Sequence, residues 1–170
     1  MPTADEIIRF LRLQPLPGEG GWYRETHRSA LQLPADVLAS RYRAARAAST
    51  AIYYLLTADT CSALHRLPTD EVFHFYLGDP VEMLQLDPNA EDGGRIVTLG
   101  SDILAGQQVQ TVVPAGVWQG SLVQAGGAFA LLGTTMTPGF DFADYEAADR
   151  VVLTAAFPKF AERIARLCPL

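Results

Sequence analysis

Apolar residues along most of this chain gather in short segments that are rich in β-branched and aromatic side chains. Turns containing glycine, proline, asparagine or serine separate these segments at short and fairly even intervals. The segments include 49–57, 72–77, 81–86, 108–113, 118–123 and 128–135. About eight short strands with tight connections are typical of a sandwich or barrel of the jelly-roll type, so we predict an all-β fold.

Helical spacing of apolar residues first occurs near the N-terminus. Thr3, with Glu6 three residues later, matches a helix N-cap and its acidic partner. Apolar residues then recur at helical spacing until Pro15 stops the pattern. We therefore predict a short amphipathic helix at about 4–13.

A second helical pattern lies near the C-terminus. Pro158 suits a first helical turn, and the apolar residues after it fall on one face of a helix. This pattern predicts a helix at about 158–168. The strands between the two helices then form a barrel at about 20–157, and the whole of 1–170 is expected to be one domain.

Composition limits the class of protein. The chain has 170 residues, of which 49% are hydrophobic and 19% are charged, so it is expected to fold around a single core. Its net charge of −6 argues against a nucleic-acid or membrane surface, since both require clustered positive charge. The N-terminal residues lack the basic start and apolar core of a signal peptide. We expect a cytoplasmic protein whose partner is a small molecule or another protein chain.

The segment 62–74 contains the chemistry on which a functional hypothesis can be built. His65 provides an imidazole that titrates near neutral pH, and Glu71 provides a carboxylate. Pro68 between them favours a turn that folds one strand end back toward the other, so both side chains could face one cavity. Since alternate residues of a strand share a face, His74 is expected to point away from the side of Glu71.

Other residues are candidates for ligand binding. Gln119 and Ser121 share one face of a predicted strand, and the Gln119 amide offers both a donor and an acceptor. Arg24 follows three glycines, which suit a loop that curls over the mouth of a barrel. Tyr53 and Tyr54 are adjacent in a strand, so only one of them can face the pocket, and we take Tyr53 as the candidate.

The segment 41–46 carries three arginines among alanines. Its composition fits either a loop or a brief helical turn, and no role follows from the pattern.

The chemistry-bearing segment resembles the first of the two signature motifs of the cupin superfamily. That motif contains two histidines, a glutamate and a later glycine at fixed spacing. His65, Glu71 and Gly78 fall in register with it, whereas Leu67 stands in the place of the second histidine.

The second cupin motif is a Pro-x-Gly turn followed after two residues by a histidine. Pro114 and Gly116 match the turn, and Gln119 occupies the histidine position. Together with the segments 18–26, 49–56, 70–80 and 138–142, these motifs resemble the cupin type 5 family over about 5–157. The resemblance implies a double-stranded β-helix barrel, similar to sugar-nucleotide epimerases, usually dimeric, with an apolar-walled pocket at one end.

A cupin metal site normally uses three histidines and one glutamate. Leu67 cannot coordinate a metal, and the amide of Gln119 is a weak replacement for an imidazole, so we expect no metal cofactor. If a metal were bound, the resemblance implies His65, Glu71 and Gln119 as its ligands.

Three functions remain open. The first is an isomerase or epimerase acting on a sugar-like or nucleotide-linked substrate, with His65 and Glu71 as the catalytic acid and base. Its ligand-binding residues would be Arg24, Tyr53, Gln119 and Ser121. The second is a binding module that uses the same pocket without catalysis, and the third is a metal-dependent oxygenase or isomerase with the reduced ligand set. The sequence does not decide whether the protein is an enzyme.

The outward faces of two predicted strands are more apolar than a solvated sheet face. One face carries Val72, His74 and Tyr76, and the other belongs to 49–57. A second copy of the chain would cover these faces, so we expect a homodimer.

Overall fold

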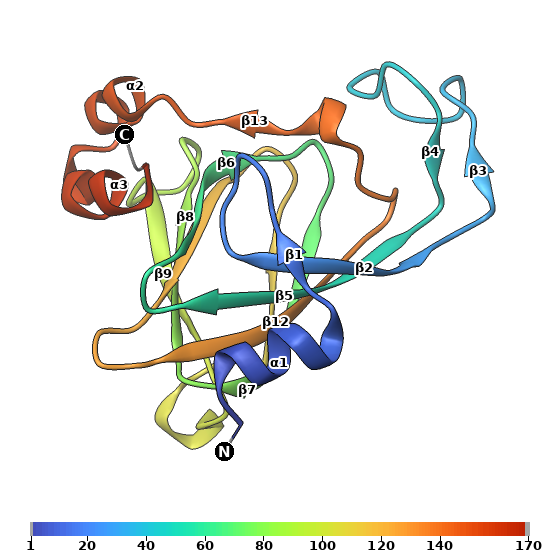
Figure 1. The fold of residues 1–170 in the computed structure, drawn as a ribbon. Helices are drawn as coiled ribbons and strands as arrows, with labels where there is room; N and C mark the ends of the chain where they lie inside the picture. Colours follow the sequence, from blue (N-terminus) through green and yellow to red (C-terminus); the bar gives the residue numbers. More distant parts are fainter. Residues whose placement is uncertain (1, 169–170) are drawn as a thin grey trace.

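Two antiparallel β-sheets pack face to face in the computed structural model, which describes residues 2–168 of the chain (Figure 1). The first sheet contains, in spatial order, β1 (Gln14–Pro15), β2 (Trp22–Arg28), β5 (Thr50–Thr57), β12 (Phe129–Met136), β7 (Glu71–Gly78) and β10 (Gln110–Val113). The second contains β13 (Glu146–Ala147), β6 (Cys61–Arg66), β11 (Trp118–Val123), β8 (Val81–Leu86) and β9 (Gly94–Leu99). A short ribbon of β3 (Gln32–Leu33) and β4 (Arg46–Ala47) lies to one side. This arrangement confirms the predicted all-β barrel.

The strands lie close to the segments expected from the sequence. The segments 81–86 and 118–123 coincide with β8 and β11, and the other four differ from their strands by one or two residues at the ends. The strands β2, β6 and β9 lie outside the segments singled out above.

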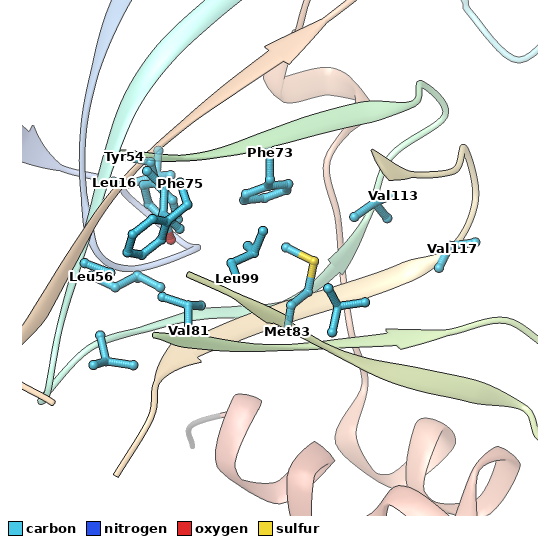
Figure 2. Close-up of a cluster of buried hydrophobic side chains, with 14 residues drawn as sticks. Leu16, Tyr54, Leu56, Phe73, Phe75, Val81, Met83, Leu99, Val113 and Val117 are labelled. Carbon is cyan, nitrogen blue, oxygen red and sulfur yellow. The ribbon is translucent and has the colours of Figure 1, made fainter. Parts of the chain in front are cut away.

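The barrel core lies between the two sheets and is built from alternate residues of their strands (Figure 2). On β7, the side chains of Glu71, Phe73 and Phe75 are buried, whereas Tyr76 is exposed and His74 is only partly buried. This alternation confirms the predicted faces of the strand. His74 contacts Thr135 and Gln110 on the outer side of the sheet and does not approach Glu71.

Helix α1 (Ala4–Leu11) begins where the sequence predicts. The Thr3 hydroxyl accepts a hydrogen bond from the Glu6 N–H, and the Glu6 carboxylate accepts one from the Thr3 N–H, which forms a capping box. The helix ends two residues earlier than predicted because Arg12 adopts a left-handed conformation with φ of 54°. Ile7 anchors α1 on the outer face of the six-stranded sheet.

The C-terminal region contains more helix than predicted. A single helix at 158–168 was expected, but Pro158–Phe160 forms a 3₁₀ turn (η3) and the α-helix α3 covers Ala161–Leu167. A further helix, α2 (Arg150–Ala156), lies in the region assigned to the barrel, and the Asp149 carboxylate caps it by accepting from two backbone N–H groups. Helices α2 and α3 pack their apolar sides against the outer face of the five-stranded sheet.

Two further 3₁₀ turns complete the described structure. They are η1 (Ile103–Ala105) and η2 (Phe142–Asp144). The helices within residues 2–168 are all too short or too polar to cross a membrane.

Candidate functional site

A cavity of about 420 Å³ lies inside the barrel, between β2, β5, β7 and β12 on one side and β6 on the other. Part of its wall is apolar, formed by side chains that include Leu16, Leu67, Phe73 and Met136. The acidic and basic side chains in the wall are Glu19, Glu25, Arg28, His65, Glu71 and Asp141. The fold therefore brings His65 and Glu71, from two facing sheets, into one cavity.

His65 is held in a single orientation. Its Nδ1 lies 2.7 Å from the carbonyl oxygen of Ala63, which can only accept, so Nδ1 carries the proton. The ring also stacks on Tyr145, with ring centroids 5.0 Å apart, and the residue is only 1% exposed. In the neutral imidazole, Nε2 therefore keeps its lone pair, and this atom is free to accept a proton.

Glu19 is a residue of the candidate site that the sequence analysis missed. Its Oε2 lies 4.0 Å from Nε2 of His65, and its Oε1 accepts a hydrogen bond of 2.7 Å from the Ser62 hydroxyl. A proton added to His65 at Nε2 would face this carboxylate. The only signal in the sequence was one acidic residue between the glycines at 18 and 20, a segment interpreted there as a support for Arg24.

The turn that carries Glu19 is fixed by hydrogen bonds from two strands. The Tyr54 hydroxyl donates to the Gly20 carbonyl over 2.9 Å, and the Ala63 N–H donates to the Glu19 carbonyl over 2.8 Å. Burial raises the pKa of Tyr54 well above its ordinary value, so the phenol stays protonated and keeps its role as donor. Glu19 is thus placed by the barrel itself.

Glu71 lies at the start of β7 and is 7% exposed. Its Oε2 accepts a hydrogen bond of 2.7 Å from Nε2 of Gln119. Burial raises the pKa of Glu71, and the nearby charge of Glu19 raises it further, while His65 and the hydrogen bonds from Thr134 and Gln119 oppose the change. The net direction is upward, which favours a neutral carboxyl group that can donate a proton.

Gln119 and Ser121 are both buried on β11, as their shared face predicts. Gln119 lies opposite His65 of β6, and Ser121 lies opposite Ser62. Among the described residues, neither Oε1 of Gln119 nor Oγ of Ser121 has a hydrogen-bond partner. Neither side chain lines the cavity, and Gln119 acts on the site through its bond to Glu71.

The structure does not bring Arg24 and Tyr53 to the cavity. Arg24 belongs to β2 rather than to a loop over the mouth, and it lies opposite Tyr53 of β5 on the outer face of the sheet. Its guanidinium sits over the Tyr53 ring, 5.5 Å from the centroid. Because strand residues alternate in direction, Tyr54 is the tyrosine that faces inward.

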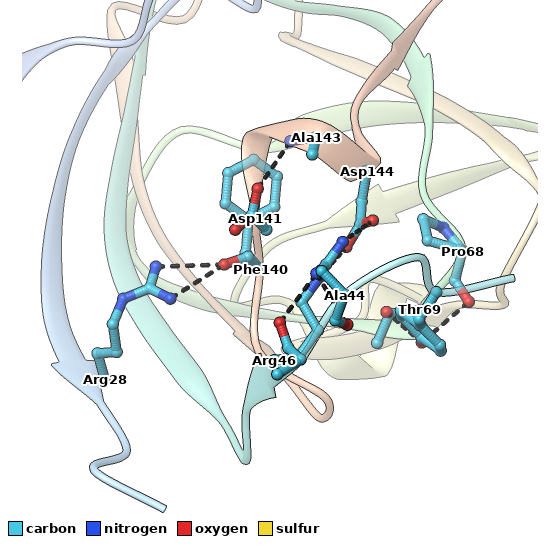
Figure 3. A network of polar contacts seen from close by, with 11 residues as sticks. Arg28, Ala44, Arg46, Pro68, Thr69, Phe140, Asp141, Ala143 and Asp144 are labelled. Carbon is cyan, nitrogen blue, oxygen red and sulfur yellow. Dashed lines mark hydrogen bonds and ion pairs between the residues drawn. The ribbon is translucent and has the colours of Figure 1, made fainter. Parts of the chain in front are cut away.

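The rim of the cavity is tied to both β2 and β4 (Figure 3). Two nitrogens of Arg28 donate to the Phe140 carbonyl over 3.2 Å, and the same guanidinium pairs with Glu25. Arg46 of β4 donates to the Asp144 carboxylate over 2.7 Å. The segment from Phe140 to Asp144 is therefore fixed at both ends, with Phe142 turned toward the cavity and Asp144 away from it.

The donor set does not fit a cupin metal centre. Leu67 lines the cavity where the family motif has a histidine, and the amide nitrogen of Gln119 donates to Glu71, so its oxygen is turned from that carboxylate. Within residues 2–168, no three His, Cys, Asp or Glu side chains are grouped so that they could hold a metal ion.

Comparison with solved structures shows close relatives over the whole chain. A hypothetical protein from Leishmania major is 31% identical, with a TM-score of 0.87, and the match covers 99% of this chain and 100% of that one. A protein from Shewanella oneidensis is 32% identical, with a TM-score of 0.85 and 99% of each chain covered. No curated protein matches the sequence.

A more distant likeness shows the fold alone. Oxalate decarboxylase from Bacillus subtilis, which has Mn(II) centres, is 16% identical with a TM-score of 0.51, and the match covers 93% of this chain and 38% of that one. Residues 5–148 match the family described as Cupin superfamily (DUF985). With this match and relatives above 30% identity along its full length, the chain belongs to the DUF985 family of the cupin superfamily.

Proposed function

We propose that the protein binds a small polar ligand in the barrel cavity and moves a proton on it, as an isomerase or epimerase of a sugar-like or nucleotide-linked substrate. The observation that carries this proposal is the presence of His65 and Glu71 in one buried cavity. His65 offers a free lone pair at Nε2, and Glu71 is a carboxyl group whose pKa is raised. Proton abstraction beside a carbonyl group, followed by return of a proton, requires a base and an acid of this kind.

The roles of the two residues follow from their surroundings. His65 would accept the proton at Nε2, and the resulting imidazolium would be stabilised by the Glu19 carboxylate 4.0 Å away. Glu71, in its protonated form, would donate to the ligand, and the Gln119 amide would stabilise the carboxylate left behind. The final protonation states would be restored by exchange with solvent or by return of the proton to the product.

The size and lining of the cavity support a small ligand. A volume of about 420 Å³ falls within the range of about 300–1,000 Å³ that is usual for small-molecule sites. Leu67 and Phe73 would pack against the apolar face of a sugar-like ring, and the polar wall would bind its hydroxyl groups. The same lining suits a binding module, so catalysis has to be tested directly.

Hydrogen exchange with solvent provides that test. The protein is incubated in D₂O with a panel of aldoses, ketoses and nucleotide-linked sugars, and mass spectrometry measures deuterium gained at carbon. We expect one class of compound to gain deuterium with the wild type and with His27→Gln, an exposed histidine outside the cavity. His65→Gln and Glu71→Gln should each slow this exchange by about a hundredfold.

Two results would speak against an acid–base enzyme. Exchange at the wild-type rate in His65→Gln would remove this residue from the chemistry. A compound that binds tightly and is recovered without deuterium would favour the binding module.

A further inference from the structure

A second depression adjoins the cavity on the outer side of its rim. This groove has a volume of about 650 Å³, and its wall is formed by the segment from Arg41 to Arg46, by Arg66 to Pro68, by Ala115 and Gly116, and by Asp141 to Glu146. Leu67 and Asp141 line both spaces. Tyr145 also joins them, because its ring forms part of the groove and stacks on His65.

The groove is lined by four arginines and three acidic residues, Asp141, Asp144 and Glu146, in a protein whose net charge is −6. Two of its arginines are neutralised, since Arg46 pairs with Asp144 and Arg66 pairs with Glu146. Arg41 and Arg43, in contrast, are exposed and make no ion pair with any residue of the described part of the chain.

Contacts of the Tyr42 side chain hold the segment from Arg41 to Arg46 in place. The Tyr42 ring lies under the guanidinium groups of Arg41 and Arg46, at 5.4 and 5.9 Å from its centroid. The Tyr42 hydroxyl is within 2.6 Å of the Thr69 hydroxyl, and this bond connects the segment to the turn that precedes Glu71. The Arg41 guanidinium is therefore held over the Tyr42 ring, and Arg43 lines the same groove beside the cavity.

The two spaces differ in charge, and this difference sets the orientation of a ligand. The Glu19 carboxylate inside the cavity repels an anionic group, whereas guanidinium groups bind phosphate oxygens with two parallel hydrogen bonds. We propose that Arg41 and Arg43 bind a phosphate group of the ligand in this groove, while the uncharged polar end of the same ligand enters the cavity. The proposal rests on the proposed function for the placement of that uncharged end, and it restricts the substrate class to phosphorylated compounds.

Isothermal titration calorimetry with inorganic pyrophosphate measures anion binding in the groove separately from chemistry in the cavity. We expect the wild type to bind pyrophosphate and the double variant Arg41→Ala/Arg43→Ala to bind it at least tenfold more weakly. The matched control is Arg9→Ala/Arg150→Ala, which removes the same charge from exposed helix positions outside the groove and should change Kd less than twofold. His65→Gln should also bind within twofold of the wild type.

Three results would overturn the proposal. They are the absence of pyrophosphate binding to the wild type at millimolar concentration, equal weakening in the control double variant, and loss of binding in His65→Gln, which would place the anion in the cavity. Failure of the acid–base proposal looks different. In that case pyrophosphate binds through Arg41 and Arg43 as expected, but no compound gains deuterium at carbon.

Discussion

At the scale of single residues, burial decides the chemistry of Glu71. Few acidic side chains are enclosed to this degree, and here the enclosing groups include a second acidic residue, Glu19. The Gln119 amide and the Thr134 hydroxyl provide hydrogen bonds to the carboxyl group but no compensating charge. The group therefore holds its proton to higher pH in the folded protein than in the unfolded chain, and stability must depend on pH.

We predict that Glu71→Gln removes a pH-dependent loss of stability. Because the pKa of Glu71 is raised in the folded state, its contribution is fully present below the ordinary value of 4.5 and is lost as pH rises through the folded-state pKa. The glutamine keeps an oxygen that can accept from Gln119 and never ionises. The free energy of unfolding of the wild type should thus fall relative to the variant as pH rises above about 4.5, by about 1.4 kcal/mol for each tenfold displacement of the ionisation equilibrium.

Urea denaturation at a series of pH values measures this difference. Glu91→Gln, at an exposed position, is the control and should follow the wild type at all pH values. A constant difference between the wild type and Glu71→Gln across the pH range would show that Glu71 ionises alike in both states.

At the scale of elements, the turn before β2 positions Glu19, and its geometry requires glycine at position 20. Gly20 has a φ of +98°, and a Cβ there would collide with the Cys61 carbonyl oxygen. Gly18 also has a positive φ, of +78°, but a Cβ there would meet no atom within 4 Å. A substitution at either glycine strains the backbone, because both have a positive φ. Of these two positions, only Gly20 would also bring a Cβ into collision with a neighbouring atom.

We predict that Gly20→Ala destabilises the protein more than Gly18→Ala does. Gly18→Ala should cost about 1–2 kcal/mol through the left-handed conformation alone. Gly20→Ala should cost a further 1–3 kcal/mol or so, because the turn has to move away from β6. Urea denaturation of both variants at one pH gives the comparison, and equal losses would mean that the turn adjusts freely and does not hold Glu19 in place.

The same turn shows which parts of the site the sequence can and cannot predict. Strand β7 follows a regular alternation, so the inward direction of Glu71 and the outward direction of His74 could be predicted. Strand β2 has no alternation of apolar and polar residues, because Glu25 and Arg28 line the cavity while Arg24 points outward, and a register shift interrupts the strand after Glu25. Its polar composition after three glycines is therefore indistinguishable from that of a loop.

Tertiary contacts explain why the sequence did not indicate Glu19 and why it did not decide between Tyr53 and Tyr54. The position of Glu19 beside His65 depends on hydrogen bonds from β5 and β6, which no local pattern encodes. The choice between Tyr53 and Tyr54 depends on register, and a shift of one residue exchanges the two faces of a strand. The barrel and the residues in cupin register could thus be predicted, while the residues contributed by β2 and by the turn before it could not.

At the scale of the whole molecule, the outer face of the six-stranded sheet is covered over only part of its area. Helix α1 covers the region around Leu55, Phe129 and Leu131. Beyond the helix, Tyr76 lies across Gly133, where any Cβ would collide with its ring, and meets Tyr53 edge to face at 6.0 Å. Tyr76 is 49% exposed and Val112 of the neighbouring strand is 43% exposed.

We predict that a second copy of the chain covers this part of the sheet and that Val112→Lys disrupts the homodimer. A flat aromatic and aliphatic surface favours burial against another apolar surface, whereas a lysine on edge strand β10 brings an ammonium group that resists desolvation. Val151→Lys, the same substitution at an exposed position of α2, is the matched control and should leave the dimer intact. Sedimentation velocity at micromolar concentration measures the mass of the species in solution. The wild type and Val151→Lys should have twice the 18.5 kDa mass of one chain, and Val112→Lys should be mainly monomeric. A monomeric wild type would contradict the dimer, and a dimeric Val112→Lys would place its interface elsewhere on the barrel.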